Sequence, residues 1–419
     1  MSTVGKRVTN VLMTSASDAG VGGVQVVFRD LVHWLEQNGR QVHLLYQAPL
    51  PGVCMEETIN PWGRRAFYCP MPAIVRKSPL LSVPLFLAYL PMTFFHLARL
   101  LHRKKIDVVN CHYLTPYFIH LVIAARLLRV PVVVSVHGAD IDSYPHSGLL
   151  QKFLFRLVMR GANRIVACSR DLARQTIEVF PDVRRKVTYV YNGVDLSHYA
   201  QVPETRALPR PFLLCVCRHV RKKGVDTLLH AFALVLPDVP ELSLVLVGSG
   251  PLLEEHKALA RKLRIDHQVA FMGEITHAEV SPFFDACALF VLPSRAEPFG
   301  IVLLEAACYV KAIVGTRVGG VPEIITNGVN GVLVESDDPA GMAAQILTLL
   351  RNPELAGQLG RQAYQTLMTR FLWKQRILDY IAIYEGRPGP SVHDVEPEAG
   401  WMGPAADGSA ARNIVSRGG

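Results

Sequence analysis

Short runs of Val, Ile and Leu alternate with longer segments of helical period along most of the chain. This alternation is typical of buried parallel strands joined by crossover helices. In the first half, the apolar runs predict strands near residues 8–13, 41–46, 108–111, 132–136, 164–167 and 187–191. In the second half, they predict strands near residues 212–217, 243–247, 268–272, 288–292 and 312–315. The predicted fold class is therefore α/β, with each half a doubly wound, Rossmann-like domain.

The pattern breaks at residues 200–211, which lose their periodicity and contain Pro203, Pro209 and Pro211. Such a stretch is typical of a linker, and 419 residues are more than one core usually supports. Near the C-terminus, a last helical segment gives way to Gly, Pro, Ala and Ser, which favours disorder. The predicted units are a first domain at 1–201, a second domain at 202–371, a helix at 372–386 and a disordered tail at 387–419.

The net charge of +9 favours polyanionic partners: phosphorylated small molecules, nucleic acid or an anionic membrane surface. No aromatic residues interleave with Lys and Arg as in an RNA-binding module, so nucleic acid is not expected. The eight cysteines lack the spacing of a zinc site or a disulfide framework, and Cys215 and Cys217 are expected to pack on one strand face. The apolar run after Arg7 stops at Thr14, too early for a signal peptide. We expect a cytoplasmic protein in a reducing compartment.

Gly22 and Gly23 lie in a loop that follows the first predicted strand and leads into a helix ending near Asn38. Glycines let the backbone approach a ligand, and a helix start favours an anion. A dinucleotide fingerprint would need a third glycine where Gln25 stands, and an acid at the end of the second strand, so an NAD enzyme is disfavoured. A plain tight turn is the alternative.

His137 follows the predicted strand 132–136, where an imidazole could hydrogen-bond a sugar hydroxyl or serve as a structural histidine. The neighbouring Asp140-Ile141-Asp142 resembles a metal-binding Asp-x-Asp motif. Three-residue patterns arise easily by chance, and no mixed-sheet context supports this one, so no metal is predicted.

In the second half, the strand 212–217 runs into Arg218 and, after a short loop, Lys223 and Gly224. Two cations at the carboxyl end of a strand could neutralise a diphosphate and stabilise its departure, although a solvated basic loop has the same composition.

Glu297 and Glu305 flank the start of the helix that follows the strand 288–292. Pro298 belongs near the first turn, which places Glu297 in the loop and Glu305 on the helix. The carboxylates could then reach sugar and ribose hydroxyls, while the N–H groups after Pro298 are free to meet phosphate or sugar oxygens. Two surface glutamates are the alternative.

In this order, these segments resemble the retaining glycosyltransferases of family 4, which have the GT-B fold, in which two Rossmann-like domains face each other across a cleft. The likeness extends over nearly the whole chain to about Glu385. It rests on Gly22-Gly23, His137-Gly138-Ala139-Asp140, Asn192-Gly193-Val194-Asp195, Arg218 with Lys223-Gly224, Gly248-Ser249-Gly250-Pro251, Glu297 with Glu305, and Gly319-Gly320-Val321-Pro322-Glu323. The chain departs from the family at Cys217, where a glycine is usual, and at Tyr309-Val310-Lys311, where small residues are usual.

The resemblance implies a role for each matching position. Arg218 and Lys223 would hold the donor diphosphate, Glu297 the sugar hydroxyls and Glu305 the ribose, while the loop 271–275 would read the base. The implied catalytic residues are His137, Arg218, Lys223 and Glu297. The implied donor-binding residues are Gly22, Gly23, Gly248, Gly250, Met272, Gly273, Phe299, Gly300, Ile301, Val302 and Glu305, and Asp140 lies on the acceptor side.

The implied reaction moves a sugar from a UDP- or GDP-linked donor to a saccharide or lipid-linked acceptor, with the anomeric configuration kept and no further cofactor. The pathway class would be cell-surface polysaccharide or glycolipid biosynthesis. The same fold also serves nucleotide-sugar epimerases, and a non-catalytic nucleotide-sugar sensor is a further alternative.

The first half also contains a nearly uncharged segment, Leu80 to Leu101, with cations on both sides of it. An apolar surface edged by cations suits the cytoplasmic face of an anionic membrane, so peripheral attachment and a lipid-linked acceptor are one interpretation. A core helix with a charged end is the other.

Overall fold

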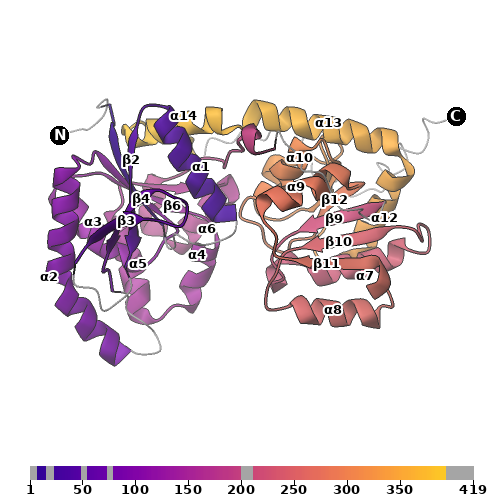
Figure 1. The fold of residues 1–419 in the computed structure, drawn as a ribbon, viewed down its shortest axis with the longest axis horizontal. Coiled ribbons are helices and arrows are strands. Elements are labelled where there is room, and N and C mark those ends of the chain that lie inside the picture. The colour runs from indigo at the N-terminus through magenta and orange to yellow at the C-terminus, as the bar shows by residue number, and fades with distance from the viewer. Residues whose placement is uncertain (1–6, 16–22, 49–53, 73–78, 200–210, 393–419) are drawn as a thin grey trace.

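The computed structural model describes residues 7–15, 23–48, 54–72, 79–199 and 211–392, and these form two α/β units that lie side by side (Figure 1). Each unit is built on its own sheet, with helices packed against the strands. The predicted fold class is confirmed.

The sheet of the first unit has eight strands in the order β3-β4-β2-β1-β5-β6-β7-β8. All neighbouring strands pair in parallel except β3 and β4, which are antiparallel. The strands are β1 (Asn10–Ser15), β2 (Gln41–Gln47), β3 (Glu56–Ile59), β4 (Arg65–Cys69), β5 (Val108–His112), β6 (Val132–Val136), β7 (Arg164–Ala167) and β8 (Val187–Tyr189). The helices are α1 (Gly23–Gln37), α2 (Pro79–Arg103), α3 (Phe118–Leu127), α4 (Ala139–Ser143), α5 (Leu149–Gly161) and α6 (Arg170–Val179).

The sheet of the second unit is parallel throughout, with six strands in the order β11-β10-β9-β12-β13-β14. Its strands are β9 (Phe212–Val216), β10 (Ser243–Val247), β11 (Val269–Gly273), β12 (Leu289–Leu292), β13 (Ile313–Thr316) and β14 (Val332–Val334). Its helices are α7 (Val225–Val235), α8 (Leu253–Lys262), α9 (His277–Ala286), α10 (Ile301–Cys308), α11 (Val321–Ile324), α12 (Pro339–Arg351) and α13 (Pro353–Arg370).

The strands predicted from the apolar runs are confirmed, with ends displaced by a few residues, but three further strands were missed. The edge strand β3 is exposed at every position and so carries no apolar signal. The strand β14 has only three residues, too few for a periodic pattern. Strand β4 was missed because it is only five residues long and begins at a polar residue, Arg65.

The closing helix predicted at 372–386 is α14 (Trp373–Tyr384), and it leaves the second unit to pack on the first (Figure 1). Trp373, Ile377 and Tyr380 are buried among the side chains of α1 and the first sheet. The chain stays packed beyond the predicted start of the tail at 387, because Val392 is buried and the Pro390 carbonyl accepts a hydrogen bond from Thr188. The predicted boundary at 201 and the tail after 392 lie outside the described residues.

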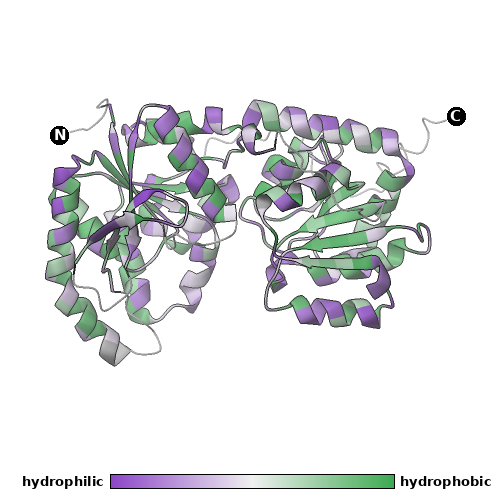
Figure 2. Cartoon of the chain, in the orientation of Figure 1, coloured by the Kyte–Doolittle hydropathy of each residue, from purple (hydrophilic) through white to green (hydrophobic). Residues whose placement is uncertain are grey.

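Helix α2 forms the edge of the first unit that is remote from the second, and apolar residues run along it (Figure 2). One face of α2 is buried through Leu97, Leu100 and Leu101, whereas Leu87 and Phe95 on another face are each 59% exposed. Among the described helices, the stretch Ser82–Arg103 alone is long and apolar enough to cross a membrane, by length and composition only.

Candidate active site

The half-buried Lys223 and the buried Glu297 form an ion pair at the carboxyl end of the second sheet. They come from the loops after β9 and β12, which are neighbouring strands, so the loops that leave them meet at one edge. Ser294 also donates to the Glu297 carboxylate, at 3.2 Å. Burial opposes the charge of Lys223, but the adjacent Glu297 carboxylate outweighs it and raises the pKa of Lys223. Lys223 is therefore held in its charged form at neutral pH.

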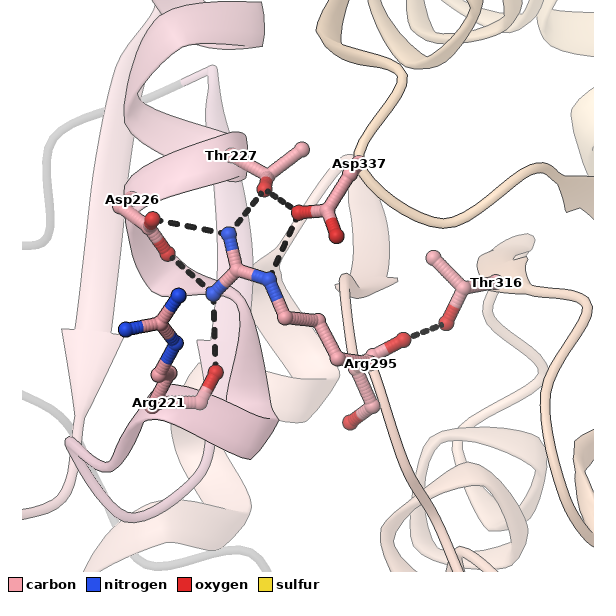
Figure 3. Close-up of polar contacts among 7 residues, drawn as sticks. Arg221, Asp226, Thr227, Arg295, Thr316 and Asp337 are labelled. Atoms are coloured by element: carbon pink, nitrogen blue, oxygen red, sulfur yellow. Dashed lines mark hydrogen bonds and ion pairs between the residues drawn. The ribbon is translucent and has the colours of Figure 1, made fainter.

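Arg295 fixes the two loops to each other (Figure 3). Its guanidinium donates two parallel bonds of 2.8 Å to Asp226 at the start of α7, and its Nε donates to Asp337. It also donates to the carbonyl of Arg221, while the Arg295 backbone N–H donates to the carbonyl of Lys222. Because these carbonyls belong to the short turn that carries Lys223, Arg295 sets the position of Lys223 relative to Glu297.

Glycines allow backbone segments to pack closely around Lys223 and Glu297. Gly224 has φ of +61°, and a Cβ there would lie 2.1 Å from the Pro293 carbonyl oxygen. Gly319 has φ of +53°, and its Cβ would lie 2.1 Å from the carbonyl oxygen of Glu297. The same carbonyl accepts a bond from the N–H of Gly320. A side chain at either glycine would push the two loops apart.

Two other predicted glycines of the second unit, Gly248 and Gly250, also allow close packing of the backbone. Cβ atoms at Gly248 and Gly250 would lie 2.0 and 2.5 Å from the carbonyl oxygens of Cys217 and His219. These glycines therefore let the loop after β10 pack against the loop that carries Arg218. At the end of β11, the other edge of this sheet, Met272 is exposed and Gly273 has open space around it.

Arg218 is exposed and lies near the first unit. Its charge acts on Tyr113, which follows β5 and has φ of +66°, a strained conformation for a tyrosine. Nearby, Lys222 and Asp142 approach to 3.6 Å across the two units. Polar side chains of both units thus lie close to Arg218.

The start of α10 faces the start of α1. A Cβ at Gly23 would lie 3.2 Å from Ile301, so these two helix starts approach closely, with Gly300 as the N-cap of α10. Gly22 lies outside the described residues. Phe299 is buried and stacks on Tyr191 of the first unit at 5.8 Å, so its backbone rather than its ring is available to a ligand.

Glu305 and Val302 lie on α10 and are half-buried. The charge of Glu305 acts on Asp30 of α1 and on Tyr199, which places this carboxylate toward the junction between the units. The structure therefore joins Lys223 and Glu297 directly and puts Arg218 at the same strand ends, with Glu305 on the helix that follows.

His137 is buried, and its Nε2 lies 3.1 Å from Nδ1 of His112. Burial lowers the pKa of His137 to about 4, so the ring is neutral at physiological pH. The sequence prediction missed His112, although it is the last residue of β5 and His137 comes directly after β6. That shared place at a strand end is the signal that could have found it.

Asp140 is fully buried, and its carboxylate points toward the backbone of its own loop. Its carboxylate accepts bonds from the N–H groups of Leu114, His137, Gly138 and Ile141. These bonds use both oxygens to hold the loops after β5 and β6, so Asp140 positions His137. A direct contact of Asp140 with the acceptor stays a prediction.

The second unit is docked on the first beside this site. The Pro298 carbonyl accepts a bond of 2.6 Å from Ser169, and Glu323 accepts bonds from the N–H groups of Arg170 and Asp171. Glu323 thus occupies the N-terminus of α6, where free N–H groups favour a carboxylate. Within the described part of the chain, no group of three or more His, Cys, Asp or Glu residues is arranged to hold a metal ion.

Comparisons with known proteins show the family of this chain. The family description "Glycosyltransferase Family 4" matches residues 21–198, and "Glycosyl transferases group 1" matches residues 201–366. The chain is 30% identical to N-acetyl-alpha-D-glucosaminyl L-malate synthase of Bacillus anthracis, over 87% of this chain and 94% of that protein. It is 29% identical to glycogen synthase of Mycobacterium tuberculosis, over 69% of this chain and 72% of that protein.

Solved structures share the fold. Sucrose-phosphate synthase from Thermosynechococcus elongatus superimposes with a TM-score of 0.70 at 20% identity, covering 90% of this chain and 98% of that one. Anabaena Alr3699/HepE in complex with UDP and glucose superimposes with a TM-score of 0.68 at 19% identity, covering 90% and 100%.

Proposed function

The chain belongs to glycosyltransferase family 4 and has the GT-B fold, and we propose that it is a retaining enzyme that transfers a sugar from a UDP- or GDP-linked donor to a saccharide or lipid-linked acceptor. The observation that carries the proposal is the largely buried Lys223–Glu297 ion pair at the carboxyl ends of β9 and β12, beside Arg218. In an open parallel sheet this edge is where ligands bind.

Each of these groups suits one part of the donor. Arg218 and Lys223 place two positive charges where the diphosphate would develop negative charge as it leaves the sugar. Glu297 can accept hydrogen bonds from sugar hydroxyls while it remains paired with Lys223. The N–H groups at the start of α10, which no side chain caps, suit phosphate oxygens.

The acceptor would enter from the first unit. His137 is neutral, so it can donate or accept a hydrogen bond with a sugar hydroxyl without adding charge. We propose that the departing phosphate oxygen takes the proton of the acceptor hydroxyl, which then attacks the same face of the sugar. The configuration at the anomeric carbon is retained in that case.

The direct test is acceptor-dependent release of nucleoside diphosphate. A panel of UDP- and GDP-sugars is first screened for protection of the protein against thermal unfolding, and the protecting donors are then incubated with saccharide and lipid-linked acceptors. UDP donors come first in the panel, because the fold neighbour Alr3699/HepE is described in complex with UDP and glucose. GDP donors are included because a relative from Mycolicibacterium smegmatis, 30% identical over 46% of this chain, is described as GDP-mannose-dependent.

The outcomes separate the candidate functions. Transfer with retention, read as the anomeric configuration of the product by NMR, supports the proposal. An inverted product contradicts the retaining mechanism. Conversion of the donor sugar without an acceptor indicates an epimerase, and tight donor binding with no turnover indicates a sensor.

We also propose that the first unit attaches to an anionic membrane surface, where a lipid-linked acceptor would be found. Exposed apolar side chains lie on α2 and on α3, which packs beside it, and a groove of about 250 Å³ runs between these helices. Exposed arginines stand at the ends of both helices. Apolar contact edged by cations is the chemistry of interfacial binding. The apolar side chains are Leu85, Leu87, Phe95, Ile123, Leu127 and Leu128, and the cations are Arg99, Arg103, Arg126 and Arg129.

Vesicle sedimentation tests this attachment. The protein is expected to sediment with vesicles that contain phosphatidylglycerol, less so in high salt, and not with phosphatidylcholine alone. The double change Leu87→Ser and Phe95→Ser is expected to weaken sedimentation. Leu234→Ser is the matched control, because Leu234 is 52% exposed on α7 of the second unit. Equal sedimentation of all three proteins, or none at all, excludes this surface.

A further inference from the structure

Cys215 lies near the end of β9, and Cys217 comes just after this strand, directly before Arg218. Residues two apart on a strand point to the same face, and the two Sγ atoms are 3.7 Å apart, within hydrogen-bonding contact for sulfur. Cys215 is buried, whereas Cys217 is half-buried. A small reagent would therefore reach Cys217 first.

The surroundings of the pair distinguish its two thiols. The hydrogen bond from Cys215 and the positive charge of Lys223 lower the pKa of the Cys217 thiol, against the effect of its burial. The shared hydrogen bond and burial raise the pKa of Cys215. The thiolate is the reactive form of cysteine, so Cys217 has the character of an attacking group and Cys215 that of a second, resolving thiol.

We infer that Cys215 and Cys217 form an oxidisable thiol pair, that a peroxide converts the pair to a disulfide, and that this disulfide disables the donor site. The effect on activity rests on the proposed function, whereas the thiol chemistry does not. The thiol chemistry needs both sulfur atoms and the neighbouring positive charge of Lys223, and this chain has all three.

The chemistry balances in two steps. The Cys217 thiolate attacks one oxygen of the peroxide, so that an S–O bond forms, the O–O bond breaks, and the second oxygen leaves and takes up the proton that Cys217 lost. The Cys215 sulfur then attacks the Cys217 sulfur, so that the S–S bond forms and the S–O bond breaks. The hydroxide that leaves takes the Cys215 proton as water. Two thiols are oxidised and one peroxide is reduced.

The backbone connects this bond to the donor site. Residues two apart on a strand have Cα atoms about 6.4–6.8 Å apart, near the upper end of the range that a disulfide spans, so closing the bond draws Cys217 toward Cys215. The N–H of Cys217 bonds the Val247 carbonyl, and Gly248 packs against the Cys217 carbonyl. Movement there shifts Arg218, the next residue, and loosens the contact between the loops after β9 and β10.

The test exposes the full-length protein to hydrogen peroxide at a low molar excess and follows two readouts. Peptide mass mapping without reduction is expected to find Cys215 and Cys217 joined, with the loss of two hydrogen atoms. Transfer activity is expected to fall at least about tenfold, toward the roughly hundredfold loss typical of a displaced charge-stabilising donor. Both changes are expected to reverse with dithiothreitol.

Three variants make the result specific. Cys217→Gly removes the attacking sulfur and is expected to keep its activity after peroxide. Cys215→Ala removes the resolving sulfur and is expected to accumulate a sulfenic acid at Cys217, detected with dimedone. Cys54→Ala removes an exposed cysteine elsewhere and is expected to behave as the unchanged protein does. Thermal unfolding confirms that each variant is folded before the comparison.

Each contrary outcome has one meaning. If no bond between Cys215 and Cys217 forms, the thiol pair is wrong, and this readout needs no substrate. If the bond forms and activity is unchanged, the link to the donor site is wrong. If the untreated protein transfers no sugar, the proposed function fails instead, and the mapped disulfide still decides the chemistry.

Discussion

Glu297 is buried and Lys223 is half-buried, so each charge of this ion pair depends on the other for compensation. We predict that Lys223→Ala lowers the turnover number by about a hundredfold or more, because the charge that balances the departing diphosphate is lost. The measurement is steady-state kinetics with a donor found in the screen. Lys222→Ala is the matched control, since Lys222 is the adjacent cation and, within the described residues, its ion pair is with Asp142, at 3.6 Å. Unchanged turnover for Lys223→Ala would remove it from the site.

Arg295 acts on the site through other residues rather than by touching the donor. We predict that Arg295→Lys lowers turnover about tenfold, because a lysine cannot reproduce the two parallel bonds to Asp226 together with the bonds to Asp337 and the Arg221 carbonyl (Figure 3). Stability is expected to fall by roughly 1–3 kcal/mol as the Asp226 carboxylate loses its partners.

The matched control for Arg295 is Arg317→Lys. Arg317 also bonds a carboxylate, Glu335, but this partner has a side chain that is 71% exposed. The control is expected to be nearly neutral in both chemical unfolding and turnover. Equal effects of the two changes would mean that Arg295 has no special positioning role.

At the scale of elements, helix α14 is attached to α1 through a buried carboxylate. Trp373 donates to Asp30 at 3.0 Å, and Asp30 is 5% exposed. Burial raises the pKa of Asp30 to about 7, and the nearby charges of Asp195 and Glu305 add to the rise. His198 also approaches Asp30, at 3.8 Å.

This raised pKa predicts how stability depends on pH. Between about pH 4 and pH 7 the folded protein holds a proton on Asp30 that the unfolded chain has lost, so the contribution of Asp30 to stability decreases as pH rises through this range. The free energy of unfolding of the wild-type protein is expected to fall from pH 4 to pH 7 relative to that of Asp30→Asn, whose side chain cannot ionise. Above pH 7 this difference is expected to stay constant. Urea unfolding of both proteins across this range gives the difference, and parallel curves would contradict the assignment.

At the scale of the whole molecule, Glu323 of the second unit joins the two units by capping helix α6 of the first unit. Its carboxylate accepts the first N–H groups of α6 from Arg170 and Asp171, at 2.9 and 2.8 Å. We predict that Glu323→Ala costs about 1–2 kcal/mol in chemical unfolding, the usual cost of losing a helix cap. Hydrogen exchange is expected to quicken at the start of α6, although the substitution lies in the second unit.

The control for Glu323 is Glu335→Ala, which removes a mostly exposed carboxylate of the same unit. It is expected to leave the exchange of α6 unchanged. Glu323→Gln retains one acceptor oxygen and is expected to fall between the two. Unaltered exchange at α6 in Glu323→Ala would show that the cap does not link the units.

The sequence by itself determined the parts of this protein that depend on local pattern. Apolar runs located most of the strands, because a parallel strand buried on both faces must be apolar along its length. The loops that follow these strands contained His137, Arg218, Lys223 and Glu297, because parallel strands direct their carboxyl ends to one edge. The exposed strand β3 and the short strand β14 left no such pattern and were missed.

Only the tertiary structure decided which of these residues touch. Trp373 and Asp30 are 343 positions apart, and Glu323 lies 153 positions from Arg170. Nothing periodic in the chain connects such residues, because their contact depends on which strands are neighbours and on how the two units dock. The same holds for His112 beside His137 and for Arg295 between two loops. The periodicity of the sequence indicates whether a residue is buried. Only the packed fold shows which residues it is buried against.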